Sequence, residues 1–295
     1  MKELYLVGGH PSSGSTTYAY RLHELGYASF PETGLLCGRF LDELGEPQGL
    51  SWLDAQVKCG WRFGPLPRDL PGRIQVLADS VDSHTLVEKT PENIYMFYDF
   101  LESGFIQGAT VTWRDPDAVA DSLARRGFAE WEALVWWADI TLHILRLRRD
   151  FGGKVHILPY HDVVLSPRQV PEPRLSIRLS STIGNSSVRW TMRGLSRLIL
   201  RDAGSLASSW RANPIDSVEP AAARPLGGGG ALRSVVRRFH LALLEHEDFQ
   251  LNEQMDAYFS IKRETDIGSL HEYLRSIAPQ LAVFHPRGAK GYSFQ

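Results

Sequence analysis

The chain has 295 residues, of which 43% are hydrophobic, and a formal net charge of −2 at pH 7. This length and apolar content suffice for a full three-layer core, and the nearly balanced charge gives no indication of a nucleic-acid partner. Two cysteines, Cys37 and Cys59, are too few for a disulfide framework and lack metal-ligand spacing, which favours a reduced, cytoplasmic setting.

The N-terminal segment contains a predicted strand, a small-residue loop and a predicted helix. An apolar run indicates a buried strand at 4–8, the loop continues to Gly14, and a helical pattern extends over 15–25 until Gly26. In such a loop the backbone N–H groups converge on an anion, and the helix dipole favours negative charge. The segment therefore predicts a phosphate-binding loop, with an ordinary tight turn as the alternative. The apolar run is too short for a signal peptide, and no apolar stretch of about eighteen residues predicts a membrane span.

Between Gly9 and Thr16 the loop nearly matches the nucleotide-binding pattern GxxxxGK[ST], but Ser15 stands in place of the lysine. That lysine normally reaches the β- and γ-phosphates, so its absence argues against a nucleoside triphosphate as the ligand. A ligand with 5′-phosphate chemistry and no γ-phosphate fits the loop.

Aromatic residues gather in two places. Residues 35–82 interrupt the strand–helix alternation and carry Trp52 and Trp61 among several prolines and glycines. We interpret this span as an insertion that shapes an acceptor pocket, with an aromatic satellite core as the alternative. Three further tryptophans are spaced as on one helix and are expected in the core: Trp131, Trp136 and Trp137.

Beyond that insertion, strands alternate with helices. The predicted strands lie at 83–87, 109–113 and 155–159, and the predicted helices at 91–103, 116–126 and 130–150. Such alternation predicts an α/β fold of three layers, with helices on both faces of a central parallel sheet. With the phosphate-binding loop, we expect it to be of the P-loop-containing nucleotide-binding type. Ligands of these sheets bind outside the carboxyl ends of the strands. The loop, Lys89, Arg114 and Tyr160 all follow such ends, so we expect them to share one crevice.

Arg114 ends a predicted strand and precedes a predicted helix. Asp115 is expected to cap that helix, Pro116 to occupy its first position, and Gly127 to end it. Ser122 lies two helical turns along. Arg114 and Ser122 are therefore placed to hold a second phosphate from two sides, the arginine through its bidentate fork.

The C-terminal part offers fewer functional signals. Residues 214–231 are rich in Pro, Ala and Gly and predict a flexible segment, and a helical pattern follows at 232–248. His161 is expected to be a polar strand-end residue, with a catalytic base as the alternative. We expect residues 1–295 to form a single domain that includes the insertion and this flexible segment.

Four segments within residues 4–167 resemble, in the same order, the sulfotransferases that use 3′-phosphoadenosine 5′-phosphosulfate (PAPS). That family carries a loop like G-x-P-[R/K]-S-G-T-T, a K-T-P segment, an R-D-P-x-x-V-x-x-S segment and Y-E-D-L-x-x-x-P. The matching residues here are Pro11, Ser13, Gly14 and Thr16; Lys89, Thr90 and Pro91; Arg114, Asp115, Pro116, Val119 and Ser122; and Tyr160, Asp162 and Pro167.

The resemblance implies that PAPS is the donor, that the loop holds its 5′-phosphosulfate, and that Arg114 and Ser122 hold its 3′-phosphate. The loop residues assigned to the donor in this way are Pro11, Ser12, Ser13, Gly14, Ser15, Thr16 and Thr17. One departure is Ser12, where the family usually has an arginine or lysine that neutralises the transferring sulfuryl group. Lys89 and His10 are the candidates to supply that charge.

The segment Pro31-Glu32-Thr33 resembles the part of bacterial members whose glutamate serves as the base. A carboxylate within hydrogen-bond reach of the acceptor can take the proton of the attacking hydroxyl. The resemblance therefore implies that Glu32 is the catalytic base, with a solvated loop glutamate as the alternative.

Taken together, these residues predict a sulfotransferase that transfers a sulfuryl group from PAPS to a hydroxyl or amine. The acceptor class is a small molecule, a carbohydrate or a secondary metabolite, and no metal is expected. Two alternatives stay open: a P-loop kinase that uses ATP, and a catalytically weak binding protein of the same fold, which Ser12 favours.

Overall fold

The structure is a computed structural model, which describes residues 1–30, 70–165, 170–179, 230–245, 251–262 and 267–282. The chain separates into two compact units. The first comprises Met1–Arg114 and Asp150–Asn213, and the second comprises Asp115–Arg149 and Pro214–Gln295. Each unit is described by itself below.

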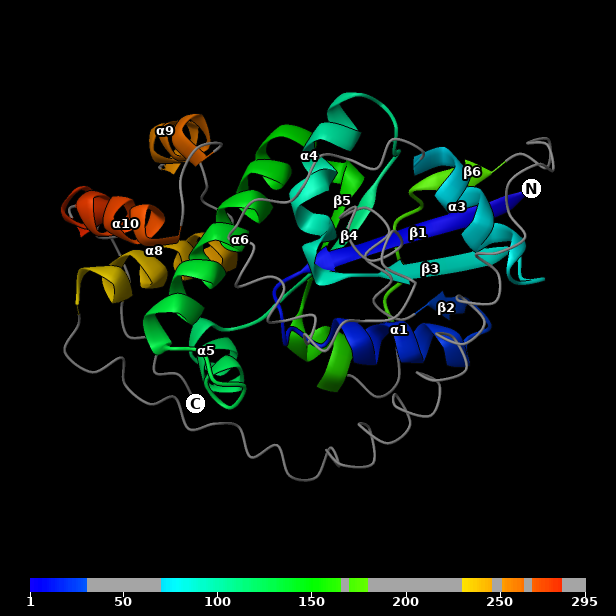
Figure 1. Ribbon diagram of the computed structural model, residues 1–295, viewed down its shortest axis with the longest axis horizontal. Helices are drawn as coiled ribbons and strands as arrows, with labels where there is room; N and C mark the ends of the chain where they lie inside the picture. Colours follow the sequence, from blue (N-terminus) through cyan, green and yellow to red (C-terminus); the bar gives the residue numbers. More distant parts are fainter. Residues whose placement is uncertain (31–69, 166–169, 180–229, 246–250, 263–266, 283–295) are drawn as a thin grey trace. The chain divides into compact units, whose positions relative to one another are not determined.

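The first unit is built on a sheet of five parallel strands in the order β2-β3-β1-β4-β5. Their bounds are Ala28–Phe30, Thr85–Lys89, Lys2–Gly9, Ala109–Trp113 and Val155–Pro159, in that order. A short sixth strand, β6 (Ile177–Leu179), runs antiparallel to the start of β1. In the centre of the sheet, Val7 lies opposite Lys89 of β3 and Thr110 of β4. The carboxyl ends of the three central strands therefore meet at one edge (Figure 1).

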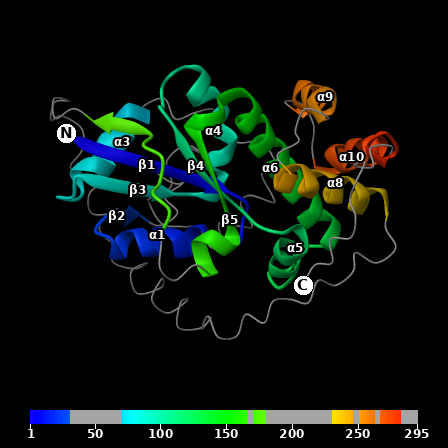
Figure 2. The same ribbon diagram turned by 180° about the vertical axis from the view of Figure 1, so that it is seen from behind.

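Helices cover both faces of this sheet. The helices between the strands are α1 (Ser15–Glu24), α3 (Leu70–Asp79), the 3-10 turn η1 (Pro91–Asn93) and α4 (Ile94–Glu102). From β1, the chain crosses toward one edge of the sheet to form β2. It then returns across the sheet in the opposite direction to form β3 and β4. Because parallel crossovers are right-handed, α1 lies on one face and α3 and α4 lie on the other (Figures 1 and 2).

Residues on the two faces of β1 determine how closely α1 and α4 pack against the strand. On one face, Tyr18 and Leu22 of α1 pack against Val7 in a buried apolar cluster. On the other face, Gly8 lies beneath the start of α4, where an added Cβ would come within 2.7 Å of the Ile94 nitrogen. Glycine at this position lets the helix backbone contact the strand directly.

The second unit is helical in its described part. Its elements are α5 (Pro116–Ala124), α6 (Glu130–Phe151, of which the last two residues belong to the first unit), α8 (Ala231–Glu245), α9 (Asn252–Lys262) and α10 (Ile267–Ala282). Asp115 caps α5 as predicted: its Oδ1 accepts hydrogen bonds from the Asp117 and Ala118 amides at 2.9 and 3.1 Å. Trp136 and Trp137 are buried as expected, whereas Trp131 is 38% exposed and stacks on His271.

The predicted α/β class, with a central parallel sheet and helices on both faces, is confirmed. The four predicted strands and the helices at 15–25, 116–126 and 130–150 lie within two residues of their observed bounds, and the predicted helix at 91–103 corresponds to η1 and α4 together. The helical pattern at 232–248 corresponds to α8. None of the described helices has both the length and the apolar composition that a membrane span needs.

Among the described strands and α-helices, five were not predicted from the sequence: β2, β6, α3, α9 and α10. The strands β2 and β6 have three residues each, which is too short for a periodic signal. The helix α3 lies inside the span 35–82 and forms the crossover between β2 and β3. Residues 35–69 of that span, and residues 214–229 of the predicted flexible segment, lie outside the described residues.

Candidate functional site

The loop between β1 and α1 is closed by hydrogen bonds to its own backbone and to β4. The His10 amide donates to the Thr112 carbonyl at 3.0 Å. The Ser13 hydroxyl donates to the His10 carbonyl at 2.6 Å, and the Thr112 hydroxyl lies 2.6 Å from the Ser13 oxygen. Ser13 is fully buried. Its side chain therefore shapes the loop from inside, and the predicted contact between Ser13 and the donor stays a prediction.

Two residues of the loop have a left-handed backbone conformation. Ser12 has a φ of 61°, the only positive φ of a non-glycine residue in the described part of the chain, and Gly14 has a φ of 82°. Such a conformation costs about 1–3 kcal/mol for a non-glycine residue, and it persists where the surroundings enforce it, often at ligand sites. The Ser12 backbone is therefore held in place by contacts outside the residue.

Gly14 also lies in a confined space. An added Cβ would come within 2.6 Å of the Val164 Cγ2 and 3.2 Å of the Tyr160 ring. Val164 belongs to η3 (His161–Leu165), a π-helical turn that follows β5. The loop thus packs directly against the segment that ends the last parallel strand.

We expect Gly14→Ala to lower the free energy of unfolding by about 1–3 kcal/mol more than Gly26→Ala does, because the new methyl group overlaps Val164. Gly26 is the matched control, since it has a φ of 96° but no atom within 4 Å of an added Cβ. Urea unfolding of both variants measures the difference. Equal losses would show that the loop tolerates a side chain against Val164.

The N-terminus of α1 points the positive end of the helix dipole at the loop. Gly14 is the cap residue and has no side chain, and the first turn contains no acidic residue. The first helical hydrogen bond runs from the Tyr18 amide to the Gly14 carbonyl at 2.9 Å. The backbone N–H groups that precede Tyr18 in the first turn of α1 therefore receive no cap from a side chain of the cap residue. N–H groups at such a helix N-terminus bind phosphate and sulfate in proteins.

Two contacts fix α1 behind this end. The Tyr18 hydroxyl donates to the Pro171 carbonyl at 2.6 Å, and the Arg21 guanidinium donates to the Val163 carbonyl at 2.9 Å. Burial raises the pKa of the Tyr18 hydroxyl well above its usual range, so it stays protonated and keeps donating. The helix that carries Thr16 and Thr17 is therefore anchored on the sheet.

Lys89 brings a positive charge to the start of α1. It is the last residue of β3, its side chain is only 3% exposed, and its Nζ donates to the Thr16 hydroxyl at 3.0 Å. The loop itself has no basic residue at the two positions where similar loops carry one. Ser15 stands in place of the lysine of GxxxxGK[ST], and Ser12 in place of the arginine or lysine of G-x-P-[R/K]-S-G-T-T. A neighbouring strand thus supplies the cation next to this loop.

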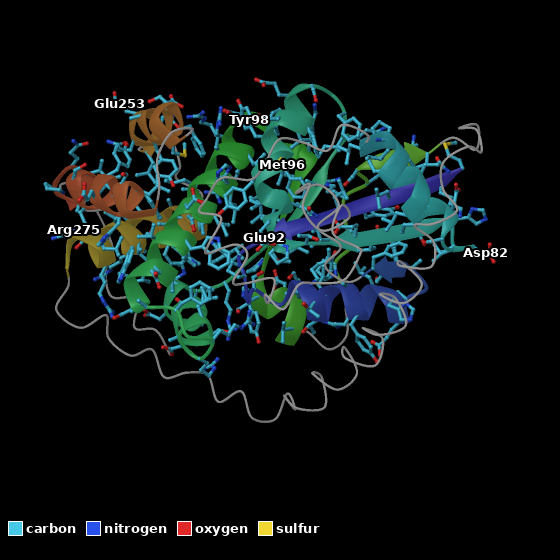
Figure 3. All side chains as sticks on the ribbon, in the orientation of Figure 1. Asp82, Glu92, Met96, Tyr98, Glu253 and Arg275 are labelled. Carbon is cyan, nitrogen blue, oxygen red and sulfur yellow. The ribbon has the colours of Figure 1, made fainter. Side chains whose placement is uncertain are left out.

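The segment that follows Lys89 locks the end of β3 onto β1. The buried Glu88 carboxylate accepts hydrogen bonds from the Thr90 hydroxyl and the Asn93 side-chain amide, both at 2.6 Å. The Asn93 amide also donates to the Val7 carbonyl at 3.1 Å. Glu92, on the same turn before α4, is buried as well (Figure 3). No role was predicted for Glu88 or Asn93, although both lie in the polar segment that ends the strand.

Arg114 contacts the loop from β4. Its Nη1 donates to the Ser12 carbonyl at 3.1 Å, and its guanidinium carbon lies 4.0 Å from the centre of the Tyr160 ring. The same ring is the neighbour of Gly14. The structure therefore brings Arg114, Tyr160 and the loop together at the strand ends.

The remaining predicted residues differ in where they lie. His10 and Pro11 are buried in the loop, and the Nε2 of the exposed His161 lies 3.0 Å from the Oδ1 of the neighbouring Asp162. Ser122 is half-buried on α5 in the second unit, so its pairing with Arg114 stays a prediction. Glu32 lies outside the described residues.

Positive side chains, rather than acidic or histidine clusters, characterise this site. In the described ranges, no group of three or more His, Cys, Asp or Glu residues has the arrangement of a metal site. Lys89 and Arg114 both donate to atoms of the loop. Comparison of the sequence with protein-family models and with curated proteins returned no match.

Proposed function

We propose that the chain is a PAPS-dependent sulfotransferase. The donor is PAPS, and the acceptor is a hydroxyl or amine of a small molecule, a carbohydrate or a secondary metabolite. The observation that carries this proposal is the hydrogen bond from Lys89 to Thr16, which delivers a buried cation to the uncapped start of α1. The loop is a P-loop-type anion cradle whose own lysine is replaced by one from β3.

The donor would bind along the carboxyl ends of the strands. Backbone amides from Gly14 to Thr17, with the hydroxyls of Thr16 and Thr17, would hold the 5′-phosphosulfate, since the Ser13 amide already donates to the His10 carbonyl. Amides at a helix N-terminus suit this group, because they donate several hydrogen bonds to an anion and add the helix dipole. Arg114 and Ser122 would hold the 3′-phosphate, which distinguishes PAPS from other adenosine nucleotides.

The transfer reaction forms one bond to sulfur and breaks another. The acceptor oxygen or nitrogen attacks the sulfur in line and loses its proton to Glu32. The bond from sulfur to the bridging phosphate oxygen breaks, and 3′-phosphoadenosine 5′-phosphate leaves with the electron pair. Lys89, with His10 as the second candidate, would neutralise negative charge on the transferring sulfuryl group. Positioning and charge stabilisation therefore provide most of the catalysis.

One observation favours a weaker relative of such an enzyme. Ser12 has no charge of its own, and its carbonyl is hydrogen-bonded to Arg114. If Lys89 does not replace the missing loop cation, the protein binds the nucleotide without efficient turnover. Binding and turnover measurements separate the two cases, since both forms bind the donor but only one consumes it.

Thermal unfolding with nucleotides tests the donor. We expect 3′-phosphoadenosine 5′-phosphate to raise the melting temperature by about 5–10 °C at a hundredfold excess over its dissociation constant, where binding stabilises by about 2.7 kcal/mol. ATP and adenosine 5′-monophosphate should give much smaller shifts. A larger shift with ATP would favour the P-loop kinase, and an equal shift with adenosine 5′-monophosphate would refute the 3′-phosphate site.

A further inference from the structure

We infer that Arg114 is a positioning residue that holds the loop in its anion-binding shape, besides any contact it makes with a second phosphate. The inference rests on the proposed function, because it concerns how the same loop binds its anion. Its starting point is that the guanidinium bonds to the protein: Nη1 donates to the Ser12 carbonyl at 3.1 Å.

The bond falls at the one place where the loop backbone is strained. Ser12 has a φ of 61°, a conformation that a residue with a side chain adopts only when its surroundings enforce it. A hydrogen bond from a charged donor is among the stronger interactions of this kind. Arg114 is thus a contact that compensates the strain at Ser12.

The same bond sets the direction of the next amide. The Ser12 carbonyl and the Ser13 N–H belong to one planar peptide group, so a donor that fixes the carbonyl also fixes the N–H. That N–H donates to the His10 carbonyl at 3.3 Å, which closes the loop. Without Arg114, this peptide group loses one of its two described hydrogen bonds, so the loop and the amides that would face an anion are held less firmly in their common direction.

The Tyr160 ring orients the Arg114 guanidinium toward the loop. The guanidinium lies over the Tyr160 ring at 4.0 Å, and the edge of this ring lies beside Gly14. Stacking on an aromatic face orients the planar fork of arginine, which a lysine side chain cannot reproduce. One ring therefore fixes both the arginine and the end of the loop that begins α1.

If Arg114 positions the loop, it affects the binding of nucleotides that lack a 3′-phosphate as well, which a simple 3′-phosphate contact does not do. If Arg114 only held the 3′-phosphate, its loss would leave the affinity for adenosine 5′-monophosphate unchanged. If it also positions the loop, its loss weakens binding of that nucleotide too. Ser122→Ala provides the matched control, because Ser122 makes no contribution to the loop in this account and should affect only ligands with a 3′-phosphate.

Amide hydrogen exchange of the full, ligand-free chain tests the inference directly. In Arg114→Ala, we expect the Ser13 and Tyr18 amides to exchange about tenfold faster, while the amides of β3 keep their protection. The affinity for adenosine 5′-monophosphate should fall by about tenfold. In a Ser12→Gly background, where positive φ costs little, Arg114→Ala should have a smaller effect on both measurements.

Unchanged exchange of Ser13 and Tyr18 in Arg114→Ala, with β3 still protected, would overturn the inference. If the alanine variant loses protection throughout the sheet, Arg114→Lys decides, because it keeps the charge but not the stacked fork. Faster exchange confined to the loop in that variant supports the inference, and wild-type exchange overturns it. A wild-type protein that does not prefer 3′-phosphoadenosine 5′-phosphate would refute the proposed donor, but the exchange result would stand independently.

Discussion

Replacing Lys89 by methionine is expected to lower turnover by about 10²–10³-fold, the usual effect of removing one group that stabilises charge in the transition state. Methionine keeps the length and apolar stem of the side chain, and the site is only 3% exposed, so the fold should persist. Release of 3′-phosphoadenosine 5′-phosphate from PAPS measures turnover, once an acceptor has been found by screening phenols, sugars and amines.

The control for this variant is Lys154→Met, since Lys154 is an exposed lysine of the turn η2 (Gly152–Lys154) and makes no contact with the loop among the described contacts. Its turnover should equal that of the wild type. Nucleotide affinity of Lys89→Met should change by less than about tenfold, because backbone amides provide most of the binding. A Lys89→Met enzyme with normal turnover would show that another group, with His10 as the first candidate, neutralises the transferring sulfuryl group.

Glu32→Gln is expected to lower turnover by about 10²–10⁴-fold without weakening nucleotide binding, because the amide keeps the size of the carboxylate but cannot take a proton. The reason is the resemblance of Pro31-Glu32-Thr33 to the base segment of bacterial sulfotransferases. The wild-type rate should fall as pH decreases through the pKa of the base, and the residual rate of the variant should lose this dependence. Rate–pH profiles of both proteins measure the difference.

The exposed Glu102, at the end of α4, offers a matched substitution, and Glu102→Gln should leave both the rate and its pH profile unchanged. If Glu32→Gln turns over at a nearly normal rate on the true acceptor, the base lies elsewhere. His161 and His10 are then the next residues to test, and only His161 is exposed in the described structure.

The sheet and its helices were largely predictable because their signals are local. The apolar run at 4–8 and the cap–proline pair Asp115-Pro116 each predict an element from adjacent residues, and the structure has a strand and a capped helix there. The three-residue strands β2 and β6 have no such signal, because their pairing with β3 and β1 depends on residues far along the chain. Long periodic elements are therefore predicted well and short edge strands are not.

The residues of the site were predictable, but their contacts were not. Lys89 was a candidate because it ends a strand, yet its bond to Thr16 depends on the parallel register that places Val7 opposite Lys89. Ser13 was assigned to the donor without a role for its hydroxyl, and the structure shows that this hydroxyl bonds to the His10 carbonyl and lies beside Thr112. A sequence pattern gives residue types and order, whereas the direction of a side chain depends on backbone angles and on neighbours from other elements.

The structure of the complex with 3′-phosphoadenosine 5′-phosphate tests the central claim most directly. We expect the 5′-phosphate at the start of α1, within hydrogen-bond distance of the amides from Gly14 to Thr17 and close to the Lys89 ammonium. The 3′-phosphate should contact Arg114, which keeps its bond to Ser12. A nucleotide bound elsewhere on the chain, or one whose 5′-phosphate lies away from both the loop and Lys89, would contradict the claim that this loop is the donor site.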